Sequence, residues 1–381
     1  MNTSPPPAEP QHFAFLDALR GLAALAVVVV HTVQNFDGGA LTPLLGLGAA
    51  GVQLFYIVSA YSLCLSLEQH RRGNSRPMQD YLLRRFFRIA PMFWLAIVFY
   101  LLQPLVLPMA VAPVNVHPPT WQLSTWHVAA TLLFVGGWHW QSINFIVPGG
   151  WSVAVESNFY GLLPFLSAFA NSPRRALILV GLTLVFAVLC RALLYRLNGG
   201  VVVAQAGEAF GIFAGLWLPA QLPVFALGIL MFNLVPRASL SARPILSSRL
   251  LQPLALGAVA LALLCWAPTA WNPYLPPGFQ AGLLLLACSW LMAWWPVRLV
   301  VNPVTLFLGK ISFSLYLLHF LALHLVLWAS RGLIEPMRGS ATSFWLAFPC
   351  VLLLGSAMAW LGFRFVEVPG QALGRRLIAR K

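Results

Sequence analysis

Residues 13–36 read FAFLDALRGLAALAVVVVHTVQNF, an apolar stretch long enough to cross a bilayer as one helix. It nevertheless carries Asp17 and Arg20 near one end and His31 towards the other. Arg20 and His31 are eleven residues apart, which is almost three helical turns. Both side chains therefore share one face, about 16 Å apart along the axis. Because ionisable groups in membrane helices usually face a bundle interior or a watery cavity, this pair predicts a site that works across the bilayer.

The composition supports a membrane protein. Of 381 residues, 60% are hydrophobic and 8% are charged, which is typical of a polytopic helical membrane protein. A net charge of +14 would suggest nucleic-acid binding in a soluble chain. Here the arginines lie in short loops between apolar segments, as the positive-inside rule expects, so membrane lipids and not nucleic acid are the expected partners. The five cysteines are scattered singly, without the spacing of metal ligands or disulfides, and no metal is expected.

The positive charges of the loops indicate which apolar segments cross the membrane. The candidates are 13–36, 49–67, 86–107, 123–140, 151–170, 175–196, 219–236, 250–267, 280–296, 305–328 and 343–365. The arginine-rich loop 68–88 should be cytosolic, and so should the connector 171–175. Three apolar segments lie between these loops, and an odd number of crossings would separate them. The weakest segment, 123–140, is broken by glycines and histidines and is predicted to be a short re-entrant or interfacial piece.

The expected fold class is therefore all-α: a polytopic membrane protein with about ten transmembrane helices, a short re-entrant segment and both termini cytosolic. The predicted outer loop 38–48 contains no lysine or arginine, whereas Arg331 and Arg338 in the last outer loop depart from the rule. Residues 1–12 are proline-rich, lack the basic start of a signal peptide, and are expected to form a disordered cytosolic tail. Residues 13–370 should form a single transmembrane domain, followed by a basic cytosolic tail over 371–381.

Two groups inside the spans could carry chemistry. The neutral imidazole of His31 could take a proton from a hydroxyl near physiological pH, although membrane histidines also make purely structural contacts between helices. Glu156 lies inside an apolar span, with Ser152 and Tyr160 one turn to either side on the same face. A buried carboxylate needs a partner. A histidine on a neighbouring helix is the expected one, and a structural pair with arginine or tyrosine is the alternative.

A third group is the run YLLRRFFRIAP over 81–91, at the mouth of the third span. Arg85 and Arg88 are one turn apart, with Arg84 beside them. Clustered guanidinium groups suit phosphates because each fork can bind two oxygens. Ordinary contacts with lipid head groups are the alternative interpretation.

A last set of polar residues is interpreted as structural. Ser312, Tyr316 and His319 share a helix face in GKISFSLYLLHF and are predicted to form a polar seam between helices, not a second active centre. His117, His127 and His139 lack a set of metal-ligand partners and are predicted to lie at the membrane interface, with a contact to a glycan as the alternative.

Taken together, these stretches resemble the membrane-bound acyltransferase-3 family. The matching pieces are LDALRGLAALAVVVVH (16–31), GVQLFYIVSAYSL (51–63), RRFFRIAP (84–91), WSVAVESNFY (151–160), GKISFSLYLLH (309–319) and FRFVEVPGQALGRRL (363–377). They follow the family's order along nearly the whole chain. The chain departs from the family pattern at Gln53 and Ala60, where many relatives carry Asp and Gly, and at Ser157 and Asn158, which replace Glu and Gln.

The resemblance implies an O-acyltransferase in a bacterial inner membrane. The expected reaction moves an acyl group, by default acetyl, from cytosolic acyl-CoA to a hydroxyl of an exported carbohydrate such as lipopolysaccharide or another surface polysaccharide. It also implies an essential histidine at His31, an essential glutamate at Glu156 and a supporting basic residue at Arg20. Acyl-CoA contacts are implied at Arg85 and Arg88.

We expect Arg84 to join these acyl-CoA contacts, and Ser152, Tyr160 and Asp17 to contact substrate. The pantetheine arm would thread from the arginines to His31, which deprotonates the acceptor. Glu156 would orient the imidazole or contact the acceptor, and an acyl-histidine intermediate is the alternative chemistry.

Many relatives also carry an extracytoplasmic domain, so this chain is expected to act alone or with a separate partner. The competing function is a proton-coupled transporter or flippase of a glycan or lipid-linked substrate. Such proteins usually have paired halves with helices broken at midspan, and the sequence shows no such symmetry.

Overall fold

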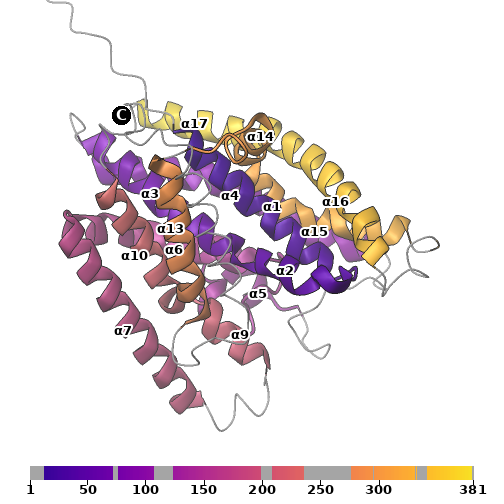
Figure 1. Cartoon of the computed structure of the whole chain (residues 1–381), viewed down its shortest axis with the longest axis horizontal. Helices are drawn as coiled ribbons and strands as arrows, with labels where there is room; N and C mark the ends of the chain where they lie inside the picture. The colour runs from indigo at the N-terminus through magenta and orange to yellow at the C-terminus, as the bar shows by residue number, and fades with distance from the viewer. Residues whose placement is uncertain are drawn as a thin grey trace, which may run out of the picture.

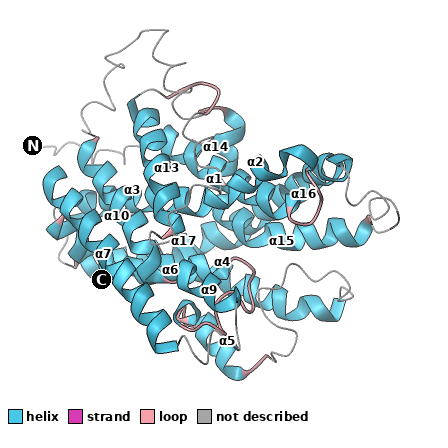
Figure 2. Ribbon diagram, turned by 60° about the horizontal axis from the view of Figure 1, so that its bottom comes forward, coloured by secondary structure: helices cyan, strands magenta, loops and turns pink. Residues whose placement is uncertain are grey.

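The computed structural model describes residues 13–71, 76–106, 123–198, 208–235, 276–294, 296–330, 332 and 341–379. Every regular element in these ranges is a helix, as Figure 2 shows. Seven helices within this described part are long and apolar enough to cross a membrane. The predicted class, an all-α polytopic membrane protein, is therefore confirmed.

The helices of the described ranges are α1 (Ala14–Val33), α2 (Thr42–Gly46), α3 (Gly51–Arg71), α4 (Pro77–Val106), α5 (Thr125–Leu132), α6 (Gly150–Phe169), α7 (Pro173–Asn198), α9 (Glu208–Leu216), α10 (Leu218–Leu234), α13 (Pro277–Trp294), α14 (Pro303–Lys310), α15 (Ser312–Ala329), α16 (Ala341–Gly362) and α17 (Val368–Ala379). Short 3-10 turns lie at η1 (Gly39–Leu41), η2 (Leu47–Ala50) and η4 (Gly136–Trp138), and η7 (Phe363–Glu367) is a π-helix.

Helix α1 lies in the middle of the bundle and contacts α3, α14, α15 and α16 (Figure 1). Glycines allow its close approach to α14. A Cβ on Gly21 would lie 2.1 Å from the carbonyl oxygen of Thr305, and a Cβ on Gly309 would lie 2.0 Å from that of Asp17. Small residues at membrane helix interfaces let backbones approach closely and maximise van der Waals packing. The α1–α14 contact fixes the height of Arg20 and His31 in the bundle.

Two predicted boundaries differ from the structure. Arg84, Arg85 and Arg88 of the predicted loop 68–88 lie on α4, which begins at Pro77 because the leucines and phenylalanines of this stretch give the helix an apolar face. The predicted segment 305–328 is two helices, α14 and α15, divided at Ile311. Helix α14 begins at Pro303 because the side-chain oxygen of Asn302 accepts hydrogen bonds from the backbone N–H groups of Val304 and Thr305, which have no partner within the helix.

The stretch 123–140 does not cross, as predicted. Its helix α5 has eight residues, far fewer than the ~20 that a span needs, and the chain then turns at Phe134, which has φ +59°. Helix α6 is as long as α1 but is not among the seven apolar candidates, because Ser152, Glu156 and Asn158 dilute its apolar character. The segment 250–267 and the tail 1–12 lie outside the described residues, so a total of ten spans stays a prediction.

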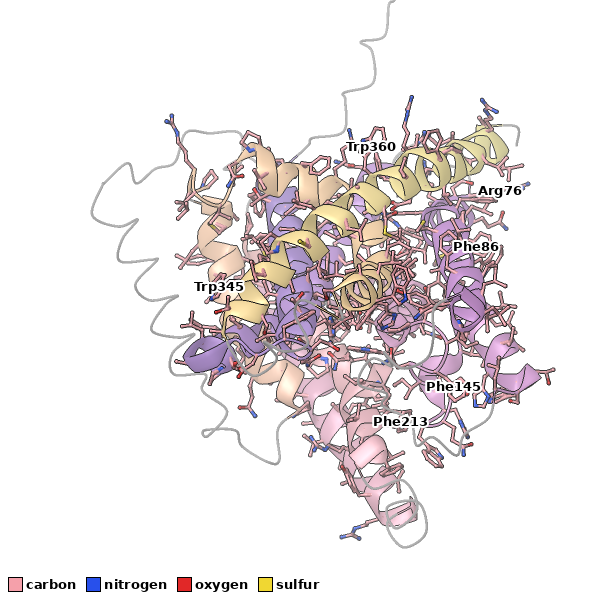
Figure 3. The ribbon with its side chains drawn as sticks, turned by 90° about the vertical axis from the view of Figure 1, so that its right-hand side faces the viewer. Arg76, Phe86, Phe145, Phe213, Trp345 and Trp360 are labelled. Carbon is pink, nitrogen blue, oxygen red and sulfur yellow. The ribbon has the colours of Figure 1, made fainter. Side chains whose placement is uncertain are left out.

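Helices α16 and α17 form one long rod through the π-helix η7, along one side of the bundle in Figure 1. Trp345 and Trp360 lie near the two ends of α16 and point outwards (Figure 3). Such exposed tryptophans near both ends of an apolar helix are typical of the two interfaces of a membrane. The basic tail predicted over 371–381 continues this rod as helix as far as Ala379.

Candidate active site

Two cavities adjoin inside the bundle. The outer cavity has a volume of about 810 Å³ and is lined by His31 and by residues of the predicted outer loop 38–48. The inner cavity has a volume of about 80 Å³ and is lined by Arg20, Arg85 and Arg88. Val52 and Tyr316 line both. Arg20 and His31 therefore face adjoining cavities of the protein interior and not lipid, as their shared helical face predicts.

The inner cavity is rich in positive charge. Arg20 donates from Nη1 to Oδ1 of Asp17 at 2.8 Å and from Nη2 to Oγ of Ser62 at 2.7 Å. Arg85 lies against the ring of Tyr81, and its buried Nε has no hydrogen-bond partner. The three guanidinium groups lie near enough to repel one another. A free guanidinium donor in a cationic, enclosed space suits an anionic ligand.

Two residues predicted to bind ligands lie apart from these cavities. Asp17 pairs with Arg20 on the first turns of α1 and is not among the described lining residues. Its carboxylate accepts a hydrogen bond from the Arg20 guanidinium, and a contact of Asp17 with substrate stays a prediction. Arg84 is half-buried on α4 and is also absent from the described linings, although Arg85 and Arg88 are present.

Glu156 lies in the inner cavity, but its partner is not the predicted histidine. Its Oε1 accepts hydrogen bonds from Oγ of Ser59 and from the hydroxyl of Tyr160, the latter at 2.9 Å. The expected histidine partner, and with it the expectation that Glu156 orients His31, is therefore wrong, and the hydrogen bond to Tyr160 matches the Glu–Tyr alternative. A contact of Glu156 with the acceptor stays a prediction. The two side chains do not meet because they line different cavities. Glu156 lies in the inner cavity with the arginines of α4, whereas His31 lies in the outer cavity.

Ser152 and Tyr160 both line the inner cavity, as their shared face with Glu156 predicts. Ser152 Oγ donates to the hydroxyl of Tyr316 at 2.7 Å, and that hydroxyl donates to the carbonyl oxygen of Gly149 at 2.9 Å. Gly149 has φ +77°, and a Cβ there would lie 2.9 Å from the Tyr316 hydroxyl. Glycine is needed at this position for both reasons. The three residues form the wall between the two cavities.

His31 contacts the seam that was interpreted as structural. Its Nδ1 lies 3.0 Å from Nε2 of His319, and its ring centroid is 4.3 Å from that of Phe320. Tyr316 separates the cavities and Ser312 lines the inner one. The interpretation of this seam as merely structural is thus incomplete. Helical spacing placed the three residues on one face, but it did not show that this face meets His31.

Amide side chains line the outer cavity, and the sequence analysis did not identify them as a group. Gln53 donates to Oε1 of Gln221 at 3.4 Å, and Gln221 donates to the carbonyl oxygen of Gly215 at 2.7 Å. Gln34, Asn144 and Trp151 complete this polar wall. Among the lining residues that the structure describes, none is acidic, lysine or arginine. The wall offers neutral donors and acceptors beside His31.

His127 and His139 lie outside the linings of both cavities. His127 accepts at Nδ1 from the backbone N–H of Ser124 at 3.1 Å and stacks on Phe145 with centroids 4.0 Å apart. Burial lowers the pKa of His127, with a smaller effect of His139, and burial also lowers the pKa of His139. Both therefore favour the neutral form. In the described ranges no group of three His, Cys, Asp or Glu side chains is arranged to hold a metal.

The fold and the site together are those of an integral membrane protein with an interior cavity on each side of one tyrosine. The family model described as an acyltransferase domain matches residues 13–364, so the chain belongs to the acyltransferase-3 family. This confirms the resemblance seen in the motifs.

Two relatives carry names that specify acetyl transfer. The peptidoglycan O-acetyltransferase OatA of Listeria monocytogenes is 26% identical over 189 residues, which are 45% of this chain and 28% of the relative. A Staphylococcus aureus (strain COL) protein, also named as an O-acetyltransferase, is 22% identical over 337 residues, or 82% of this chain and 50% of the relative. The chain thus spans half or less of the length of these curated relatives. No solved structure matches it.

Proposed function

We propose that the protein is a multi-pass O-acyltransferase of a bacterial inner membrane. It moves an acyl group, by default acetyl, from cytosolic acyl-CoA to a hydroxyl of an extracytoplasmic glycan such as a surface polysaccharide. The observation that carries this proposal is the pair of adjoining cavities, one lined by three arginines and the other by His31. The O-acetyltransferase names of the relatives support the acetyl group and the oxygen acceptor.

The inner cavity is the proposed donor site. Acyl-CoA is strongly anionic, and the guanidinium groups of Arg20, Arg85 and Arg88 can bind its phosphates. Because the cavity is small, it suits the thin pantetheine arm, and the nucleotide stays at its cytosolic mouth. Glu156 supplies the negative charge that offsets part of this cluster when no donor is bound.

The outer cavity is the proposed acceptor site. Its amides at Gln53, Gln221 and Asn144 can exchange hydrogen bonds with sugar hydroxyls, and Trp151 offers an apolar face. His31 takes the proton of the acceptor hydroxyl while the alkoxide oxygen attacks the thioester carbonyl carbon. The carbon–sulfur bond then breaks, and the thiolate of CoA leaves with the proton from His31. An acyl-histidine route would use the same imidazole as nucleophile.

The test is acyl transfer by the purified protein in lipid nanodiscs, with radiolabelled acetyl-CoA and glycan fragments as acceptors. His31→Ala should lower turnover by a factor of about 10² to 10⁴ or more, the usual contribution of a general base. The matched control is His139→Ala, which removes a histidine outside both described linings and should retain turnover. Full turnover by His31→Ala would exclude the proposed mechanism. Glycan translocation without any acyl turnover would instead support a transporter.

A further inference from the structure

The protonation of His319 can be read from its hydrogen bonds. Its Nδ1 lies 2.6 Å from the carbonyl oxygen of Tyr316 and 3.2 Å from that of Leu315. Carbonyl oxygens only accept hydrogen bonds, so Nδ1 of His319 must carry a proton. In the neutral ring the other nitrogen, Nε2, is then an unprotonated acceptor.

The surroundings of His319 favour this neutral ring. The side chain is 0% exposed, and its ring contacts are His31, Tyr316 and Phe320, none of which is acidic. His324, the next histidine of α15, is directed to Gln103. A buried imidazolium without a counter-charge would be costly. His319 therefore presents a lone pair at Nε2.

That lone pair faces His31. Nε2 of His319 lies 3.0 Å from Nδ1 of His31, and the ring centroids are 5.1 Å apart with 29° between the planes. The centroid separation exceeds the nitrogen separation by about the width of one ring, so the two nitrogens meet edge to edge. Because His319 can only accept here, Nδ1 of His31 must donate.

We propose that His319 is a positioning residue, which holds His31 with its proton on Nδ1 and a bare lone pair at Nε2 for the outer cavity. This inference rests on the proposed acyl transfer. Only a nitrogen with a free lone pair can take the proton of an acceptor hydroxyl. When Nε2 of His31 takes that proton, the ring becomes cationic and its bond to His319 becomes charge-assisted and stronger. The proton leaves with the thiolate, and His319 stays neutral throughout.

This arrangement corresponds to the histidine of a hydrolase triad, whose tautomer is fixed by a hydrogen-bonded partner. Here the partner is a neutral imidazole in place of a carboxylate. Since Glu156 is hydrogen-bonded to Ser59 and Tyr160, His319 is the side chain that the structure places on Nδ1 of His31, beside the backbone of Val27 one turn earlier on α1.

The kinetic test compares two substitutions at one position. His319→Leu removes the acceptor and should lower kcat about 10²-fold or more while leaving KM for acyl-CoA unchanged. His319→Gln can still accept through its amide oxygen and should restore a substantial part of kcat. Acyl-CoA should protect both variants against heat denaturation as it protects the wild type, which separates a folded variant from an unfolded one.

A carboxylate at the same place gives a second readout. His319→Glu would stabilise the His31 cation, so the acidic limb of the kcat–pH profile should move to higher pH relative to wild type and His319→Gln. An unmoved limb would show that the side chain at position 319 does not contact the imidazole that takes the proton, and would overturn the proposal. Wild-type kcat in a folded His319→Leu variant would overturn the proposal.

The tautomer can also be measured without turnover. In histidine-labelled protein in nanodiscs, the nitrogen-15 chemical shifts of His31 should show a protonated Nδ1 and an unprotonated Nε2, and His319→Leu should lose this pattern. A wild-type His31 with its proton on Nε2 would overturn the positioning role. Because this measurement needs no substrate, its failure is distinct from a failure of the proposed acyl transfer.

Discussion

At the scale of single residues, the arginine cluster and Glu156 set the electrostatics of the inner cavity. Three guanidinium groups share a small enclosed space with one carboxylate. Enclosure strengthens both the attraction for an anionic ligand and the mutual repulsion of the arginines. The side chains that line the cavity therefore carry a surplus of positive charge, which a bound anion offsets.

Removing two of these charges should weaken donor binding. Arg85→Ala with Arg88→Ala should lower the affinity for acyl-CoA, because each charged hydrogen bond contributes roughly 1.5–3 kcal/mol, or about tenfold or more in affinity. The loss should be larger at low salt than at high salt. The measurement is equilibrium binding of acyl-CoA, and Arg174→Ala, an exposed charge at the start of α7, is the control. If the double variant binds acyl-CoA with unchanged affinity, these arginines do not bind the donor and serve only to set the orientation of the protein in the membrane.

The charge of Glu156 can be tested without altering its shape. Glu156→Gln keeps an oxygen that accepts from Ser59 and Tyr160 but removes the negative charge. The variant should melt at a lower temperature, because the arginines lose their counter-charge, and acyl-CoA should raise its Tm by more than it raises that of the wild type. Equal shifts in the two proteins would contradict this role of Glu156.

At the scale of elements, glycines determine how closely the helices and turns of the site approach. Gly149, the residue directly before α6, is in a left-handed conformation and contacts Tyr316, the residue that separates the cavities. Gly21 and Gly309 bring α1 against α14. A side chain at any of these positions would move an element that carries a residue of the site.

Gly149→Ala should therefore destabilise the protein and reduce acyl transfer. The left-handed backbone alone costs an alanine roughly 1–2 kcal/mol, and the new methyl group displaces the Tyr316 hydroxyl. Gly161→Ala on the same helix is the control, since a Cβ there meets nothing within 4 Å. It should be neutral or stabilising by up to about 1 kcal/mol. Melting temperature in detergent and acyl transfer are the measurements, and equal behaviour of the two variants would contradict the prediction.

Gly21→Ala tests the contact between α1 and α14. The added methyl group would lie 2.1 Å from a backbone carbonyl oxygen, so the two helices must separate. We expect a lower melting temperature and a lower yield of folded protein. Gly181→Ala on α7, where a Cβ meets nothing within 4 Å, should behave like the wild type. If Gly21→Ala is as stable as Gly181→Ala, the close packing is not required.

At the scale of the whole molecule, the two cavities place the proposed donor and acceptor sites towards opposite sides of the membrane. The inner cavity lies with the arginines of α4, and the outer cavity lies with the loop 38–48. Figure 3 shows Arg76, at the start of α4, and Phe145 and Phe213 towards opposite ends of the molecule. The positive-inside rule assigns the arginine end to the cytosol.

Acetyl-CoA should consequently be used from one side of the membrane only. Sealed inside-out vesicles, which expose the arginine side, should transfer acetyl groups from acetyl-CoA added to the medium. Right-side-out vesicles should do so only after permeabilisation, because the charged donor cannot cross the bilayer. Equal activity of intact vesicles of both orientations would contradict the proposed direction of transfer.

Periodicity and charge in the sequence determine the helical membrane class, the shared face of Arg20 and His31, and the polar stripe on α6. These are properties of one helix at a time, so the residues of that helix are sufficient to predict them. The tertiary structure alone decides what each face meets. It pairs Glu156 with Ser59 and Tyr160, and it pairs His31 with His319, which is 288 residues away in the chain. Helical spacing fixes the direction of a side chain about its own axis, whereas packing of the whole bundle selects the neighbour at the same depth.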